Sequence, residues 1–415
     1  MTRRTVITGV GAIAPTGIGI DLVWKAAREG LCAIAPLTRY DPRGTPLALA
    51  GEIRGFEPLE HLEGRIVAQT DRFTHLALAA SDMALRDAAL SPAELPPYSF
   101  GVVTASCAGG VEFGQQEIQR LWSKGPRHVG PYQSIAWFYA ASTGQISLRH
   151  GLKGPSGVLV TDEAGGLDAV AYARREIGRG ATAMLAGGAE APLSPFSMAC
   201  QFGHGLLSAE RDARRGYLPF TARAPGFVPA EGGAMIVLEE AGAALARDAE
   251  PQAEVLGHGT TFTGARRFGP SAEGLAAAAR IALAEAGVGR HEVDVVFADA
   301  LGVPEADAAE VAALRAVFGA RLRSVPVTAP KSGTGRAYSG AAALDVALAV
   351  RGLRHGVIPP TPRVGTTDPA LHDLNLVTGR ARTVPVRTAL LLSRGLAGNN
   401  SALVLGRSPS QGETS

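Results

Sequence analysis

Short apolar runs alternate along the first part of this chain with segments in which apolar residues recur every three or four positions. The runs at 5–11, 100–105 and 181–187 are typical of buried strands. The segments at 73–90 and 167–179 have the spacing of helices. Strands that alternate with helices of about 10 to 15 residues indicate an α/β architecture.

A second series of elements begins near residue 253 and follows a similar order. Its expected strands are 254–257, 293–297, 325–328, 388–392 and 401–405, and its expected helices are 272–286, 303–317 and 339–354. We therefore predict a duplicated α/β fold with one half at 1–250, a second half at 251–408 and a tail at 409–415. No Pro/Ser-rich linker lies at the divide, so we expect the halves to pack side by side as one body.

The composition excludes several classes of protein. The 415 residues are 46% hydrophobic and 19% charged, which suits a large buried core. A formal charge of +2 gives no reason to expect a nucleic-acid partner, and no stretch approaches the roughly 18 apolar residues of a membrane span. The three cysteines, Cys32, Cys107 and Cys200, are too few for a disulfide framework and favour a reducing, cytoplasmic location.

Two short motifs resemble cofactor sites without meeting their requirements. Gly9-Val10-Gly11 follows a strand, as in a dinucleotide fingerprint, but Pro15 and Gly17 argue against the helix that such a site needs. Lys331-Ser332 resembles the end of a phosphate loop, but the two glycines of that motif are absent. The histidines and cysteines show no close metal-ligand spacing. We predict neither a cofactor nor a metal.

Longer segments carry a far more specific resemblance. They include Pro219-Phe220, Gly226-Phe227-Val228-Pro229-Ala230-Glu231-Gly232-Gly233-Ala234 and Pro330-Lys331-Ser332-Gly333-Thr334-Gly335. Through these segments the chain resembles condensing enzymes of the thiolase fold over nearly its full length, which implies a layered αβαβα body. Residues 122–126, 136–140 and 297–299 are most similar to the chain-length factor, the beta subunit of type II aromatic polyketide ketosynthases.

The resemblance also identifies the positions that carry chemistry in the family. A cysteine on a tight strand-to-helix turn attacks the acyl group, two histidines stabilise the enolate, and a lysine supports the site. Here Glu163 stands at the cysteine position, Leu301 and Arg336 stand at the histidine positions, and Lys331 alone remains. A carboxylate could form only a mixed anhydride that water destroys, and leucine donates no hydrogen bond. His258 lies too far upstream of Lys331 to replace the first histidine. We therefore expect no condensing activity.

Glu163 departs even from the pattern of the partner subunits, which usually carry glutamine at this position. At a helix N-terminus we expect this glutamate to stay ionised. A buried carboxylate needs a cationic partner, and our hypothesis is that Glu163 pairs with Arg336 and plugs the former site. The alternative is that the two side chains point apart and each finds other partners.

The resemblance implies a heterodimer with a catalytic ketosynthase alpha subunit, to which an acyl carrier protein brings the growing poly-β-ketone. The chain would extend into a tunnel at the interface. Val111, Gly114 and Ile118 share one helical face in the segment that matches the tunnel lining of the family. Shorter-chain members carry bulkier, aromatic residues at such positions, so Val and Gly here imply room for about ten to twelve ketide units. Alternatively, these three are ordinary core residues. Cys107 is either a substitute nucleophile or a small packing residue.

Two other functions stay open from the sequence. One is a malonyl-carrier-protein decarboxylase that primes chain synthesis and uses Glu163 and Arg336. The other is a free-standing homodimeric thiolase-like protein with an unrelated binding function.

Overall fold

The structure is a computed structural model that describes residues 3–264 and 270–408, so the predicted tail at 409–415 lies outside the described residues. Its main sheet contains two sets of five strands that are joined edge to edge. In the first half the spatial order is β6-β5-β7-β8-β1, with bounds β1 Thr5–Ala14, β5 Phe100–Ala105, β6 Ser156–Leu159, β7 Ala183–Glu190 and β8 Gly232–Glu240. In the second half the order is β11-β10-β14-β15-β9, with bounds β9 Ala253–Phe262, β10 Val295–Phe297, β11 Val327–Thr328, β14 Thr388–Arg394 and β15 Asn399–Gly406.

The two sets of strands repeat one topology. In each set, the second, third and fourth strands along the chain pair in parallel, and the fifth pairs antiparallel with its neighbours. The sets meet where β1 pairs with β9, through Val6 opposite Glu254 and Ile7 opposite Ala253. The predicted duplication is therefore present strand by strand. The exact boundaries of the halves remain a prediction.

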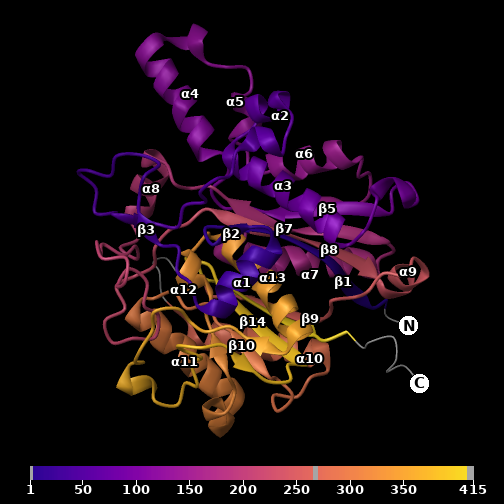
Figure 1. Ribbon diagram of the computed structural model, residues 1–415, viewed down its shortest axis with the longest axis vertical. Coiled ribbons are helices and arrows are strands. Elements are labelled where there is room, and N and C mark those ends of the chain that lie inside the picture. Colours follow the sequence, from indigo (N-terminus) through magenta and orange to yellow (C-terminus); the bar gives the residue numbers. More distant parts are fainter. Residues whose placement is uncertain (1–2, 265–269, 409–415) are drawn as a thin grey trace.

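Helices cover both sets of strands and also fill the space between them (Figure 1). The inner layer contains α7 (Gly165–Gly178) and α13 (Ser339–His355), and all residues of α13 from Ser339 to Leu353 are buried. The first set is covered outside by α3 (Arg72–Asp87) and α6 (Ala141–His150), and the second by α10 (Ala272–Ala286) and α11 (Pro304–Phe318). This is the predicted αβαβα arrangement.

The remaining elements lie around this body. The helices among them are α1 (Ile20–Glu29), α2 (Gly64–Gln69), α4 (Val111–Lys124), α5 (Gln133–Ala136), α8 (Pro195–Phe202), α9 (Ala241–Ala246) and α12 (Lys331–Thr334). The short strands are β2 (Gly17–Ile18), β3 (Ala35–Pro36), β4 (Leu49–Ala50), β12 (Val357–Ile358) and β13 (Arg382–Thr383). The 3₁₀ turns are η1 (Pro58–Glu60), η2 (Pro92–Glu94), η3 (Pro126–His128), η4 (Asp162–Ala164), η5 (Gly319–Arg323) and η6 (Pro369–Leu371). Helix α4 projects from the body at the top of Figure 1. Within the described ranges, no helix combines the length and apolarity needed to cross a membrane.

The glycines that resemble a dinucleotide fingerprint have a packing role. A Cβ atom on Gly9 or Gly11 would lie 2.3 or 2.0 Å from a carbonyl oxygen of α3. Gly257 and Gly259 of β9 stand in the same relation to α10, with distances of 2.3 and 2.1 Å. These glycines let the outer helix of each half approach its strand closely. No helix begins at the first pair, because β1 continues to Ala14.

Candidate functional site

The turn before α7 directs the side chain of Glu163 toward the interior of the protein. Asp162 has a φ of 56°, a left-handed conformation that few non-glycine residues adopt, and its carboxylate accepts a hydrogen bond of 2.9 Å from the Ala397 N–H. The next residue, Glu163, is 1% exposed. Its backbone oxygen accepts a hydrogen bond of 3.2 Å from the Ser393 hydroxyl. The tight turn of the thiolase-like site is thus present, with a carboxylate at its tip.

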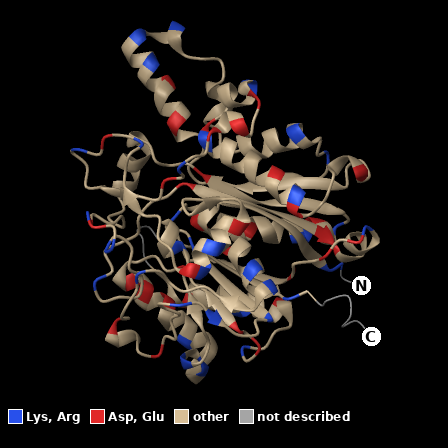
Figure 2. Ribbon diagram, in the orientation of Figure 1, with Lys and Arg blue, Asp and Glu red and all other residues tan. Residues whose placement is uncertain are grey.

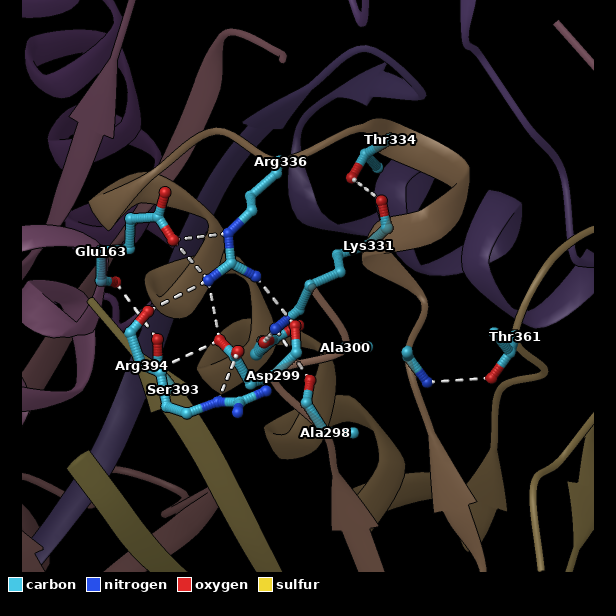
Figure 3. A network of polar contacts seen from close by, with 12 residues as sticks. Glu163, Ala298, Asp299, Ala300, Lys331, Thr334, Arg336, Thr361, Ser393 and Arg394 are labelled. Carbon is cyan, nitrogen blue, oxygen red and sulfur yellow. Dashed lines mark hydrogen bonds and ion pairs between the residues drawn. The ribbon is translucent and has the colours of Figure 1, made fainter. Parts of the chain in front are cut away.

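Arg336 reaches this carboxylate from the second half of the chain (Figure 3). Its Nε and Nη2 atoms lie 2.6 and 2.5 Å from Glu163 Oε2, and the side chain is 2% exposed. The same guanidinium also binds Asp299, through a bond of 2.9 Å to its backbone oxygen and one of 2.8 Å to Oδ1. The structure confirms the expected pairing of Glu163 with Arg336, and it adds a second carboxylate to the pair.

Asp299 in turn connects to a second buried arginine. Arg394, the last residue of β14, contacts Asp299 Oδ2 at 3.0 Å and Glu310 Oε2 at 3.2 Å. Glu310 also accepts hydrogen bonds of 2.8 and 2.9 Å from the N–H groups of Asp299 and Ala300. Although burial opposes it, Arg336 and Arg394 hold the pKa of the Asp299 carboxyl well below its usual range. We call Glu163, Asp299, Glu310, Arg336 and Arg394 the buried ion cluster.

The expectation that Glu163 stays ionised needs correction. Burial raises the pKa of its carboxyl to about 7, against the opposing effect of Arg336. The charges of Asp162 and Asp299 add to this rise, and Arg336 also binds Asp299, so it does not cancel the effect of burial. Only Oε2 of Glu163 faces the arginine, and Oε1 has no hydrogen-bond partner among the described residues. Near neutral pH, Glu163 therefore exists in both protonation states.

Lys331, which the resemblance identifies as the supporting lysine, is buried and makes two polar contacts. Lys331 Nζ lies 2.5 Å from Asp345 Oδ2 and donates a hydrogen bond of 2.9 Å to the backbone oxygen of Ala298. Burial raises the pKa of Asp345 to about 6, against the opposing effect of Lys331. The ammonium group is thus held between a carboxylate of α13 and the end of β10.

Leu301 lies in the loop between β10 and α11 and is 2% exposed. It packs in one apolar cluster with Tyr217, Phe227 and Tyr338. The Phe227 ring lies 5.9 Å from the Arg336 guanidinium carbon, so the same cluster covers the buried ions. The position that the resemblance assigns to an enolate-stabilising histidine is thus occupied by a hydrocarbon side chain.

The match to known families fits this geometry. Residues 2–244 match the N-terminal domain of beta-ketoacyl synthases, and residues 252–364 match the C-terminal domain. The chain belongs to the beta-ketoacyl synthase family. It is 57% identical over 406 residues to a putative polyketide beta-ketoacyl synthase 2 of Streptomyces halstedii, covering 98% of this chain and 97% of the relative.

Further relatives place the chain within the family. It is 49% identical to the tetracenomycin polyketide synthase ketoacyl synthase beta subunit of Streptomyces glaucescens, over 97% of this chain and 98% of the relative. Among solved structures, the ishigamide ketosynthase/chain length factor superposes with a TM-score of 0.92 at 29% identity, covering 99% of this chain and all of that one. The chain is therefore a beta subunit of the chain-length-factor type, as its sequence predicted.

Cys107, which lies after β5, has surroundings that disfavour a thiolate. Burial raises the pKa of its thiol well above the usual range, and the nearby carboxyls of Glu190, Asp162 and Glu163 add to this effect. The side chain packs at the edge of the apolar cluster that contains Leu301. These observations favour the packing role over a thiolate nucleophile.

His258 is bonded elsewhere. Its Nε2 atom lies 3.0 Å from both Asp168 Oδ1 and Ser401 Oγ, between α7, β9 and β15. Neither partner belongs to the buried ion cluster, in keeping with the expectation that His258 does not replace a catalytic histidine. Within the described residues, no group of three or more histidine, cysteine or acidic side chains could hold a metal ion.

The predicted tunnel residues lie on α4. A Cβ atom on the buried Gly114 would be 3.6 Å from Trp137 Cβ and 3.8 Å from Gln133 Nε2, both ordinary contacts. Val111 is partly buried, and Ile118 is 44% exposed, so Ile118 is not a core residue of the single chain. Their role in a tunnel stays a prediction.

Helices α4 and α5 also expose large apolar side chains. The most exposed is Trp122, at 83%, and the others are Ile118, Ile135, Trp137 and Phe138, at 40 to 49%. We call these five residues the α4–α5 apolar face. Figure 2 shows that Lys and Arg are interspersed with Asp and Glu over the fold, α4 included.

Sequence reasoning missed much of the buried ion cluster. Asp299 was noticed only as part of a family-like segment, and Arg394 and Glu310 were not noticed. One signal was available, because Asp299 and Arg394 each stand at the carboxyl end of an apolar strand, where a charged residue is unusual unless it is paired.

Proposed function

We propose that this chain is the non-catalytic, chain-length-determining subunit of a type II polyketide ketosynthase heterodimer. The observation that carries the proposal is the buried ion cluster, in which Glu163 and Arg336 fill two of the catalytic positions and bind each other. Leu301 fills a third position with hydrocarbon. Such a site has no thiolate to hold an acyl chain and no imidazole to stabilise an enolate.

The α4–α5 apolar face supports a permanent partner. Exposed aromatic residues gathered on a projecting element are typical of a protein interface, and Trp122 and Trp137 are the residue type most often found at its centre. A related solved structure is described as a type II polyketide synthase acyl-carrier protein in complex with its ketosynthase bound to the hexaketide; it superposes with a TM-score of 0.90 at 26% identity. We infer a cysteine-bearing ketosynthase alpha subunit as partner, and an acyl carrier protein as the carrier of the chain.

Val111, Gly114 and Ile118 then lie where α4 meets this partner. Gly114 places no side chain beside Trp137, and from this small bulk we infer a long product of about ten to twelve ketide units. A phenylalanine at position 114 would add a ring to this face of α4 and shorten the path that the poly-β-ketone can follow.

The test is reconstitution of the heterodimer with its carrier protein and malonyl groups, followed by mass spectrometry of the polyketides. Gly114→Phe should shorten the main product by at least one ketide unit. Gly114→Ala is the matched control, because its Cβ would make only ordinary contacts, and it should leave the product length unchanged. An unchanged product length in Gly114→Phe would overturn the proposal.

The structure disfavours the decarboxylase alternative. Arg336 is buried and bonded to Glu163, Asp299 and the Arg394 backbone oxygen, so it has no free face for a malonyl carboxylate. We expect a Glu163→Ala heterodimer to release carbon dioxide from malonyl carrier protein at the rate of the unaltered one. A large loss of release would favour the alternative. Copurification with a ketosynthase alpha subunit would count against the free-standing homodimer.

A further inference from the structure

Glu190, the last residue of β7, is a carboxylate buried without a cation. It is 0% exposed, and within the described ranges it forms no ion pair with lysine or arginine. Burial raises its pKa, and hydrogen bonds oppose that rise. A carboxylate in this setting is retained only where several donors satisfy it.

Four donors converge on the Glu190 carboxylate. Oε1 accepts hydrogen bonds of 2.6 Å from the Cys107 N–H and 2.5 Å from the Ser339 hydroxyl. Oε2 accepts bonds of 3.2 Å from the Ser106 hydroxyl and 3.4 Å from the Ala108 N–H. Three of the four donors belong to one turn, which joins β5 to α4.

This turn sets the direction of α4. The Ser106 hydroxyl accepts a hydrogen bond of 3.1 Å from the Gly109 N–H, and Gly109 has a φ of 65°. Gly110 then donates a bond of 2.9 Å to the backbone oxygen of Trp137, and the helix begins at Val111. Val111 and Gly114 lie in the first turn of α4, so a change in this turn displaces them directly.

The fourth donor comes from the other half of the chain. Ser339 is the first residue of α13 and follows Arg336 by three positions. Through its hydrogen bonds, Glu190 therefore connects the segment that contains Arg336 and Ser339 to the turn that precedes α4.

We propose that Glu190 is a positioning residue for product length: its carboxylate fixes the angle at which α4 leaves the sheet, and so the place of Val111 and Gly114 beside the growing chain. This inference rests on the proposed function, because it uses the tunnel role of α4.

Glu190→Gln replaces one of the two accepting carboxylate oxygens by an NH₂ group and keeps the shape of the side chain. A hydroxyl can rotate to accept a bond from the new NH₂ group, but a backbone N–H cannot. Whichever way the amide is placed, it sets one NH₂ against the N–H of either Cys107 or Ala108. The Glu190→Gln turn therefore loses at least one backbone hydrogen bond.

The experiment compares Glu190→Gln with Glu239→Gln in the heterodimer. Glu239 of β8 is also 0% exposed, but it pairs with Arg247 and lies at the opposite end of the β7–β8 strand pair, where it faces Ala183. Product lengths are measured by mass spectrometry, and amide hydrogen exchange is measured over residues 106–118. In Glu190→Gln the share of the main product should fall at least twofold as other lengths increase, and exchange should rise at least fivefold. Glu239→Gln should change neither.

An unchanged length distribution in Glu190→Gln, or an equal change in Glu239→Gln, would overturn the inference. If Glu190→Gln does not assemble, Ser339→Ala decides, because it removes a single donor; it should broaden the lengths in the same direction, and an unchanged distribution would overturn the inference. Comparison with Gly114→Phe shows whether the role of Glu190 or the proposed function itself is wrong. If Gly114→Phe shortens the product and Glu190→Gln has no effect, only this inference fails. If Gly114→Phe has no effect, the proposed function fails.

Discussion

Arg336 Nη2 and Glu163 Oε2 lie 2.5 Å apart, although the two residues are 173 positions apart in the sequence. One guanidinium serves two carboxyls here, because Asp299 Oδ1 is 2.8 Å from the same nitrogen. The cluster therefore holds one more acid than base, and Glu163 is the member whose pKa is raised to about 7. The predictions on stability follow from this imbalance.

The first prediction concerns stability and pH. The folded Glu163 carboxyl has a pKa of about 7, above its value of 4.5 when unfolded, so the folded state holds the proton more tightly. The stability of the unaltered protein therefore falls as pH rises through this interval, and Glu163→Gln lacks that loss. The free energy of unfolding of Glu163→Gln, relative to the unaltered protein, should rise by on the order of 3 kcal/mol between pH 5 and pH 8.

Urea unfolding at several pH values measures this difference. The other carboxyls with raised pKa are present in both proteins and cancel; they are Asp71, Glu190, Asp307, Glu310 and Asp345. Glu285→Gln is the control, because, although burial opposes it, Arg174 and the His258 N–H lower the pKa of Glu285. Its relative stability should not rise with pH. A flat profile for Glu163→Gln would contradict the prediction.

The second prediction concerns the loss of the central cation. Arg336→Leu leaves Glu163 and Asp299 buried without their shared partner, and we expect the free energy of unfolding to fall by about 3 to 5 kcal/mol. Arg315→Leu removes an ion pair with Asp373 whose arginine side chain is 38% exposed, and we expect a fall of about 1 kcal/mol or less. Chemical denaturation of both variants checks this; similar losses would show that the buried pair is worth no more than a surface one.

The third prediction concerns the α4–α5 apolar face. Trp122 is 83% exposed in the single chain, so Trp122→Ala should leave the melting temperature of that chain unchanged. Its removal should weaken binding to the ketosynthase alpha subunit tenfold or more, as measured by calorimetry. Tyr98→Ala is the aromatic control: Tyr98 is 73% exposed just before β5, whereas α4 follows the other end of that strand. Equal binding by both variants would remove this face from the interface.

The fourth prediction concerns cysteine reactivity. Because burial raises the pKa of the Cys107 thiol, iodoacetamide at pH 8 should modify it at least tenfold more slowly than the exposed Cys200, as followed by peptide mass spectrometry. Cys107→Ala should also leave the polyketide yield of the heterodimer unchanged. Rapid labelling of Cys107 together with a loss of yield would revive its role as a nucleophile.

The fold was predictable because its evidence is local. Each half repeats strand and helix periods that are visible without any partner, and the repeat of their order predicted the duplication. The projection of α4 was not predictable, since the turn before this helix is bonded to Glu190, which lies 83 positions from Cys107 in the sequence. The predicted strand at 181–187 also ended three residues before Glu190, so that carboxylate was overlooked.

The site was predictable only where chemistry demanded a partner. A glutamate at a buried turn requires a cation, and Arg336 was the replacement at a neighbouring family position. Asp299 and Arg394 could not be placed from the sequence, because their contacts join the ends of two strands that pair only in the folded sheet. The prediction that Glu163 stays ionised was wrong because burial raises the pKa of its carboxyl, and Asp299, which binds the same arginine, adds to that rise.

The close packing of the two inner helices, α7 and α13, makes the two halves of the chain depend on each other. A Cβ atom on Gly166 of α7 would lie 2.5 Å from backbone atoms of α13, so each inner helix is packed directly against the other. If the halves were separated near residue 250, each would expose this packing surface to water, and we expect that neither fragment would fold into a working domain. The buried ion pair takes Glu163 from one half and Arg336 from the other, so it forms only where the two halves pack together.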